Sequence, residues 1–194
     1  MFKKIKELIR DEELVIGFRE HLRNININAT VLESEPKVQA FTNFIGSVKV
    51  ENRNINLVEI EMKAGGGEWE GIDFSANVYR YNYLVQAKID GLENKLKVEA
   101  KPIKKGFLSK EVVGLKWEGG SLAQLLNADS DLKTKLLQEG LVEIEIRPDK
   151  KNQCIRIRQK PFHSKTMLAL PTRDAFEIYD RIAQRIRRLA NTRP

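Results

Sequence analysis

The stretch ANVYRYNYLVQAKI, residues 76–89, alternates apolar and polar side chains more regularly than any other part of the chain. Six side chains fall on one face at a period of two: Tyr79, Tyr81, Tyr83, Val85, Ala87 and Ile89. This period is typical of a β-strand with one buried face. The dipeptide Asp90-Gly91 follows, and it favours a tight turn. We therefore expect a strand that returns along residues 95–103 as a hairpin.

Segments of similar character recur along the rest of the chain. They are NININATVL (24–32), FIGSVKV (44–50), INLVEIEM (55–62), EVVGLKW (111–117) and the two arms of LVEIEIRPDKKNQCIRIRQ (141–159). Apolar side chains at helical spacing mark residues 1–22, 122–126, 132–138 and 173–190. Together these segments predict an α+β fold. We expect a mainly antiparallel β-sheet, an N-terminal helix and a C-terminal helix–hairpin–helix lobe.

The sequence EGGS near residue 119 indicates a boundary between two lobes. The first, 1–118, combines the N-terminal helix with a β-rich part, and the second, 119–194, is a smaller α+β lobe; one compact unit is the alternative. Residues 84–103 and 141–162 look alike, down to a Lys-Pro pair followed by an apolar residue. A duplicated unit explains this likeness, and so do two hairpins that obey the same patterning.

Positive charge is concentrated at the end of the chain. The net charge is +7, yet residues 145–194 hold 13 Lys and Arg against 5 Asp and Glu. This asymmetry favours an anionic partner, either nucleic acid or an anionic membrane surface. The residues that we expect to bind a polyanion are Lys150, Lys151, Arg156, Arg158, Arg181, Arg185 and Arg188.

The alternative is that these cations are paired within the protein. On the polar face of the hairpin, Glu143 is expected opposite Arg158 and Glu145 opposite Arg156. Glu177 precedes Arg181 by one helical turn. If polyanion binding is correct, the lysines of the hairpin and the arginines of the last helix share one face. If ion pairing is correct, they are distributed among carboxylates.

The loop GGGEWEG, residues 65–71, is the most glycine-rich part of the chain. A phosphate-binding loop leads into a helix and carries no carboxylates at its centre. Here two glutamates flank Trp69, and a strand follows, so we reject a phosphate site in this loop. Trp69 is instead expected either to contact a partner or to fold back onto its own sheet.

Ser121 lies in the sequence GGSLA, between an expected strand and an expected helix. With Asp149 and His163 it has the chain order of one class of serine hydrolase, although the second glycine of the nucleophile-elbow motif is missing. Ser121 followed by Gln124 also fits a capping box, in which side chains satisfy the free N–H groups of a helix start. We favour the cap and keep the hydrolase as an alternative.

Metal and cofactor sites find little support. The chain has one cysteine, Cys154, and two histidines far apart, so no transition-metal ligand cluster is expected. NADSDL spaces Asn127, Asp129 and Asp131 as calcium ligands are spaced, but Leu132 and Gln138 replace the glycine and glutamate that such a loop needs. We expect Asp129 or Ser130 to cap a helix instead, and we expect no cofactor.

The sequence therefore favours a soluble, cytoplasmic, non-catalytic binding or interaction protein. Its longest apolar run near the N-terminus, Leu14–Phe18, is too short for a signal peptide or a membrane span. The partner is not identified by the sequence, and Trp69 is the candidate contact residue. Weak polyanion binding through the basic C-terminal residues and a hydrolase using Ser121 are the alternatives.

Overall fold

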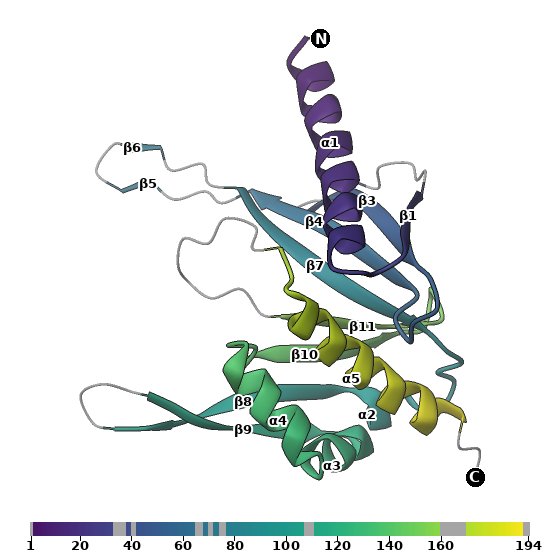
Figure 1. The fold of residues 1–194 in the computed structure, drawn as a ribbon, viewed down its shortest axis with the longest axis vertical. Coiled ribbons are helices and arrows are strands. Elements are labelled where there is room, and N and C mark those ends of the chain that lie inside the picture. The colour runs from purple at the N-terminus through teal and green to yellow at the C-terminus, as the bar shows by residue number, and fades with distance from the viewer. Residues whose placement is uncertain are drawn as a thin grey trace. The chain divides into compact units, whose positions relative to one another are not determined.

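A computed structural model describes residues 2–32, 38–39, 42–64, 68–69, 72–73, 77–106, 111–159 and 170–191 (Figure 1). Its helices are α1 (Phe2–Asn24), α2 (Glu93–Leu96), α3 (Ser121–Asn127), α4 (Ser130–Gln138) and α5 (Arg173–Asn191). Its strands are β1 (Ala29–Leu32), β2 (Val38–Gln39), β3 (Thr42–Val50), β4 (Leu57–Ala64), β5 (Glu68–Trp69), β6 (Ile72–Asp73), β7 (Asn77–Gln86), β8 (Val98–Lys105), β9 (Glu111–Gly119), β10 (Ile144–Asp149) and β11 (Cys154–Gln159).

The predicted α+β class is confirmed. Eight strands form an antiparallel sheet in the order β1-β3-β4-β7-β11-β10-β8-β9, with β2 pairing β3 off this path and β5 pairing β6 separately. One helix precedes the sheet in sequence, and α3, α4 and α5 belong to the C-terminal part of the chain. Within the described residues, no helix is both long and apolar enough to cross a membrane.

The predicted hairpin at Asp90-Gly91 is wrong. β7 ends at Gln86, and the chain turns through Gly91, whose φ is +75°, into the short helix α2 before β8 begins. β11 and β10 lie between β7 and β8 in the sheet. Alternation identifies each strand, but the identity of its neighbour depends on tertiary packing. The two look-alike segments thus have different structures, β7-α2-β8 and β10-β11, so a duplicated hairpin is excluded.

The chain divides into two compact units. The first contains Met1–Asn52, Leu57–Asn82 and Pro161–Leu170, and the second contains Arg53–Asn56, Tyr83–Lys160 and Pro171–Pro194. The expected boundary at residues 118 and 119 falls within the last residues of β9, which belongs to the same unit as α3. The division into lobes 1–118 and 119–194 stays a prediction.

In the first unit, α1 packs against β1 and β3. Phe18 is buried on its inner face, and its ring stacks on Tyr81 of β7 at 4.6 Å between centroids. A Cβ at Gly46 would approach a methyl carbon of Val15 to 2.5 Å, so β3 needs glycine where the helix crosses it. Close packing of α1 on β3 therefore explains the glycine at this position of the strand.

In the second unit, α3 and α4 pack against the β8–β9 hairpin and against α5. The predicted apolar stripe of α5 is confirmed, with Phe176, Ile182 and Ile186 fully buried. Tyr179 stacks on Tyr83 of β7 at 4.0 Å. This core fixes the direction in which the polar face of α5 projects its arginines.

The starts of α3 and α4 differ from each other. The capping box predicted at Ser121 is wrong: Gly120 is the N-cap residue of α3, and no side chain caps the helix. A Cβ at Gly120 would lie 2.1 Å from the backbone oxygen of Asn94, so a glycine is needed there and Ser121 is displaced into the first turn. Asp129 does cap α4, as expected, by accepting a hydrogen bond from the Leu132 amide at 3.1 Å.

Candidate functional site

The basic residues of β10 and β11 are engaged with carboxylates. Glu145 lies opposite Arg158 rather than opposite Arg156, its expected partner, and its side chain is only 6% exposed. It accepts hydrogen bonds from Nε of Arg158 at 2.7 Å and Nε of Arg147 at 2.6 Å. Burial alone would raise the pKa of Glu145, but the two arginines outweigh it and hold the pKa below its ordinary value.

The partner predicted for Arg156 is wrong. Register places Arg156 opposite Arg147 rather than opposite Glu145, its expected partner. Arg156 instead forms an ion pair with Asp149 at 3.9 Å, near the turn of the hairpin. The strand direction was predicted correctly, but the pairing was offset by two residues, and such an offset keeps every side chain on its predicted face.

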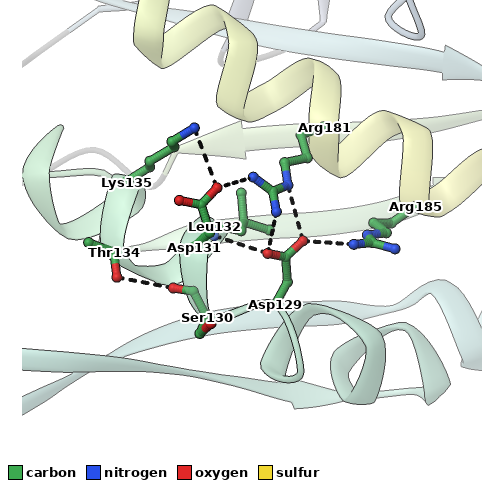
Figure 2. A network of polar contacts seen from close by, with 8 residues as sticks. All are labelled: Asp129, Ser130, Asp131, Leu132, Thr134, Lys135, Arg181 and Arg185. Carbon is green, nitrogen blue, oxygen red and sulfur yellow. Dashed lines mark hydrogen bonds and ion pairs between the residues drawn. The ribbon is translucent and has the colours of Figure 1, made fainter.

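Two arginines of α5 meet at the N-terminus of α4 (Figure 2). Arg181 forms a bidentate ion pair with Asp129 and also reaches Asp131. Arg185 donates to the same Asp129 carboxylate at 2.9 Å. Asp129 therefore accepts from two guanidinium groups and one backbone amide, while its side chain is 4% exposed.

The electrostatics of this cluster cancel locally. Burial would raise the pKa of Asp129, but Arg185, the Leu132 amide and Arg181 together lower it below its ordinary value. Two arginines face two aspartates, Asp129 and Asp131, so their charges are compensated within the unit. The expected partner of Arg181, Glu177, instead lies near Arg53 at 3.4 Å and Arg173 at 3.9 Å.

The polyanion set is thus divided. Four of its members, Arg156, Arg158, Arg181 and Arg185, form ion pairs with Asp149, Glu145, Asp129 and Asp131. Lys150 lies 3.4 Å from Glu93 of α2 but remains 68% exposed. Lys151 is exposed in the β10–β11 turn, and Arg188 is exposed near the end of α5. Polyanion binding by the seven residues stays a prediction.

A second network joins α5 to the segment Arg53–Asn56. Asp180 of α5 is 9% exposed and accepts three hydrogen bonds: from the Asn54 amide at 2.6 Å, the Asn54 side chain at 2.9 Å and the Ile55 amide at 3.0 Å. Arg187, about two turns further along α5, donates to the Asn54 carbonyl at 2.9 Å and to Oδ1 of Asn56 at 2.7 Å. Both acceptors are neutral oxygens.

These residues were not predicted from the sequence, and Arg187 was not among the seven residues expected to bind a polyanion. A signal was present, since Asp180 interrupts the apolar stripe of α5 directly after Tyr179. A carboxylate on a buried helix face needs donors, and this one receives them from the backbone of the loop.

Two hollows adjoin this network. One, of about 420 Å³, has mixed charge; it is lined by Asn54, Lys135, Gln138, Glu139, Asp174, Glu177, Ile178, Asp180, Arg181 and Gln184. The other, of about 610 Å³, is lined by Asn54, Gln184, Arg187, Arg188 and Asn191. Every lining residue of the second hollow carries an amide or a guanidinium group. Its formal charge is therefore positive.

The β8–β9 hairpin has an inner and an outer half. In the inner half, Ala100 lies opposite Trp117, and both are buried beneath α3 and its neighbours. In the outer half, Ile103 is 48% exposed and Val113 is 49% exposed. Figure 1 shows this outer half extending beyond α3 and α4. The same two strands carry four lysines: Lys101, Lys104, Lys105 and Lys116.

β9 is the last strand of the sheet path, so its outer edge pairs with no other strand among the described residues. Asn127 of α3 covers this edge at one point. Its side chain accepts from the Trp117 amide at 2.9 Å and donates to the Trp117 carbonyl at 2.8 Å, as a neighbouring strand would. Backbone groups of alternate residues face the same edge, so those of Leu115 also face outward, beyond the reach of this amide pair.

The remaining sequence candidates are tested only in part. Trp69 belongs to β5, but its side chain lies outside the described residues. Ser121 is the first residue of α3, and His163 lies outside the described residues, so the hydrolase stays a prediction. Among the described residues, no cluster of three or more His, Cys, Asp or Glu side chains could hold a metal ion.

Comparisons of the chain with protein-family models, with curated proteins and with solved structures found no match. Function is therefore inferred from the chemistry of the surfaces described above.

Proposed function

We propose that this protein is a non-catalytic interaction module that binds an extended, acidic segment of a partner protein along the outer half of β9. The observation that supports the proposal is that the backbone groups of this edge are satisfied by a side chain at one end of β9 and have no strand partner among the described residues further along. Asn127 satisfies the outward backbone groups of Trp117, whereas the edge continues past it without a strand partner among the described residues. An added strand would gain backbone hydrogen bonds there.

The side chains beside the edge indicate what kind of segment would fit. Ile103 packs over Gly114, where the strand has no side chain, and both Ile103 and Val113 keep about half of their surface exposed. These residues offer apolar contacts to alternate side chains of an added strand. Lys101 and Lys116 share Glu118, at 2.7 and 3.5 Å, yet both lysines remain more than half exposed. Residues 101–105 and 111–116 contain four lysines and one glutamate, so acidic side chains in the partner are favoured.

The rival interpretation is that lysines and a bulge merely protect an edge strand from aggregation. The register of β8 and β9 does shift between Ile103 and Lys104. Protection alone, however, does not need two exposed β-branched side chains in the same region. The presence of Ile103 and Val113 therefore favours binding over protection.

The proposal is tested with a fluorescent eight-residue peptide in which glutamate alternates with valine. Fluorescence anisotropy should show saturable binding to the full chain. The double substitution Lys104→Glu with Lys105→Glu should weaken binding at least tenfold, because two attractive charges become repulsive. Val113→Ser should weaken it about threefold through lost apolar contact. Lys88→Glu, an equal change per site at an exposed lysine outside the hairpin, is the matched control and should change affinity less than twofold.

Two further peptides separate strand addition from simple charge attraction. A peptide methylated on alternate backbone nitrogens keeps its charge but cannot donate along one edge, so it should bind at least tenfold more weakly. A peptide with lysine in place of glutamate should not bind. Equal binding of the methylated peptide would disprove strand addition, and equal loss in the Lys88→Glu control would disprove the location. We propose that the protein binds this partner in the cytoplasm, the compartment expected from the sequence.

A further inference from the structure

The positively charged hollow at the end of α5 is a second feature with chemical meaning, independent of the β9 edge. Its lining contains two guanidinium groups and three side-chain amides, from Arg187, Arg188, Asn54, Gln184 and Asn191. Such groups donate hydrogen bonds in fixed directions, and guanidinium forks match the oxygens of a phosphate. A volume of about 610 Å³ exceeds what a single phosphate needs.

Arg187 is held in place by two neutral oxygen acceptors. Nε and one terminal nitrogen donate to the Asn54 carbonyl and to Oδ1 of Asn56, which are both neutral. Asn54 is itself fixed by Asp180 through its amide and its side chain. Oδ1 of Asn56 also accepts from the Gln86 amide at 2.8 Å, which anchors the loop to β7. Anion binding therefore costs the Arg187 side chain little further conformational entropy.

The contrast with Arg181 and Arg185 makes this arrangement specific. Those two arginines, on the same helix, meet aspartate carboxylates. Arg187 is half-buried, meets neutral oxygens, and retains a second terminal nitrogen beyond the two that these bonds use. The C-terminal end of a helix disfavours an anion, but this dipole effect is weaker than a charge-assisted hydrogen bond to one guanidinium.

We propose that this hollow binds a phosphate group, with Arg187 as the oriented ligand and Arg188, Gln184 and Asn191 completing the site. Asp180 and Asn54 are positioning residues, because they hold the loop that orients Arg187. The phosphate belongs either to a small molecule or to a single-stranded nucleic acid. Both sources present the same oxygens to the site.

The experiment is calorimetric titration of the full chain with inorganic phosphate, at constant ionic strength set by chloride. Saturable binding by the wild-type chain is expected. Arg187→Gln should weaken it at least tenfold. Because Arg187 also anchors the loop, a second variant avoids its contacts: Gln184→Glu places a carboxylate in the lining and should weaken binding at least fivefold. Gln138→Glu on α4 is the matched control outside this hollow and should change affinity less than twofold.

A ten-nucleotide single strand, titrated in parallel, distinguishes the sources. If the phosphate is part of a nucleic acid, the strand binds more tightly than inorganic phosphate and Gln184→Glu weakens both. If it belongs to a small molecule, Gln184→Glu weakens inorganic phosphate alone. Absence of saturable phosphate binding by the wild-type chain, or equal losses in Gln184→Glu and Gln138→Glu, would overturn the proposal. Neither result bears on peptide binding at β9, whose variants lie on other residues.

Discussion

Asp129 and Asp180, two buried carboxylates of the second unit, use their hydrogen-bonding capacity in opposite ways. Asp129 accepts from Arg181, Arg185 and one backbone amide, so opposite charges meet. Asp180 accepts only from neutral N–H groups of Asn54 and Ile55. Asp129 thus compensates the charge of two arginines, whereas Asp180 holds the loop that contacts Arg187.

This difference indicates which arginines of a basic protein are candidates for anion binding. Counting cations selected Arg181 and Arg185, whose charges are cancelled, and passed over Arg187, which meets neutral oxygens. The quantity that matters for anion binding is the charge left uncompensated in a fixed position, rather than the number of arginines along a helix. Three substitutions and one change of pH test the contrast between Asp129 and Asp180.

The largest effect is expected from Asp129→Asn. Asparagine can still cap α4, but it removes the negative charge that two guanidinium groups share. Removing one partner of a fully buried pair typically costs 3–5 kcal/mol, and both arginines are about 30% exposed, so we expect a loss of about 2–3 kcal/mol. Urea denaturation measures this loss. A change below about 1 kcal/mol would show that solvent, rather than Asp129, compensates the arginines.

The same substitution at Asp180 should cost less, about 1–2 kcal/mol, because its donors are neutral. Asp180→Asn keeps one oxygen for the two backbone amides but presents N–H groups to the Asn54 side chain. The Ile55 amide should exchange with deuterium faster, and phosphate binding should weaken along with it. Unchanged exchange at Ile55 would mean that the loop is held by other contacts.

Lowering the pH should destabilise the fold through the Asp129 cluster, without any substitution. The pKa of Asp129 and of Glu145 lies below the ordinary value in the folded protein. A carboxyl with a depressed folded pKa stabilises the fold above its unfolded pKa, and this stability is lost as pH falls through the folded pKa. Stability should therefore decrease below about pH 4, near the ordinary values for Asp and Glu. Asp129→Asn should show a shallower decrease, and an equally steep one would assign the acid sensitivity elsewhere.

Much of the fold was predictable because alternation and helical spacing are local signals. The strands β3, β4, β9, β10 and β11 and the helices α1 and α5 occur where the sequence placed them. The pairing of β7 with β11 was not predictable, because Asp90-Gly91 favours a hairpin locally and only the sheet as a whole decides otherwise. Local signals identify the strands, and non-local packing chooses their neighbours.

The candidate sites were less predictable than the fold. Glu145 and the arginines of β11 could be placed on one face because they lie on one hairpin, close in sequence, although the pairing was offset by two residues. Asn54 and Arg187 are separated by more than half of the chain, and Asn127 meets Trp117 through a side chain that mimics a strand. Contacts of this kind depend on where the helices of the unit pack, which composition and periodicity do not specify.

The smallest effect is expected at the margin of the Asp129 cluster. Lys135 lies 3.4 Å from Asp131 across one turn of α4, and both side chains are more than half exposed (Figure 2). Solvent screens such pairs, and ordering two long side chains offsets most of the attraction. Lys135→Gln should therefore leave the urea midpoint unchanged within its reproducibility, while Asp129→Asn shifts it clearly. A shift of the midpoint by Lys135→Gln as large as that by Asp129→Asn would mean that exposed ion pairs of α4 stabilise the fold as much as buried ones. Burial of the carboxylate would then not explain why Asp129 matters more than its exposed neighbours.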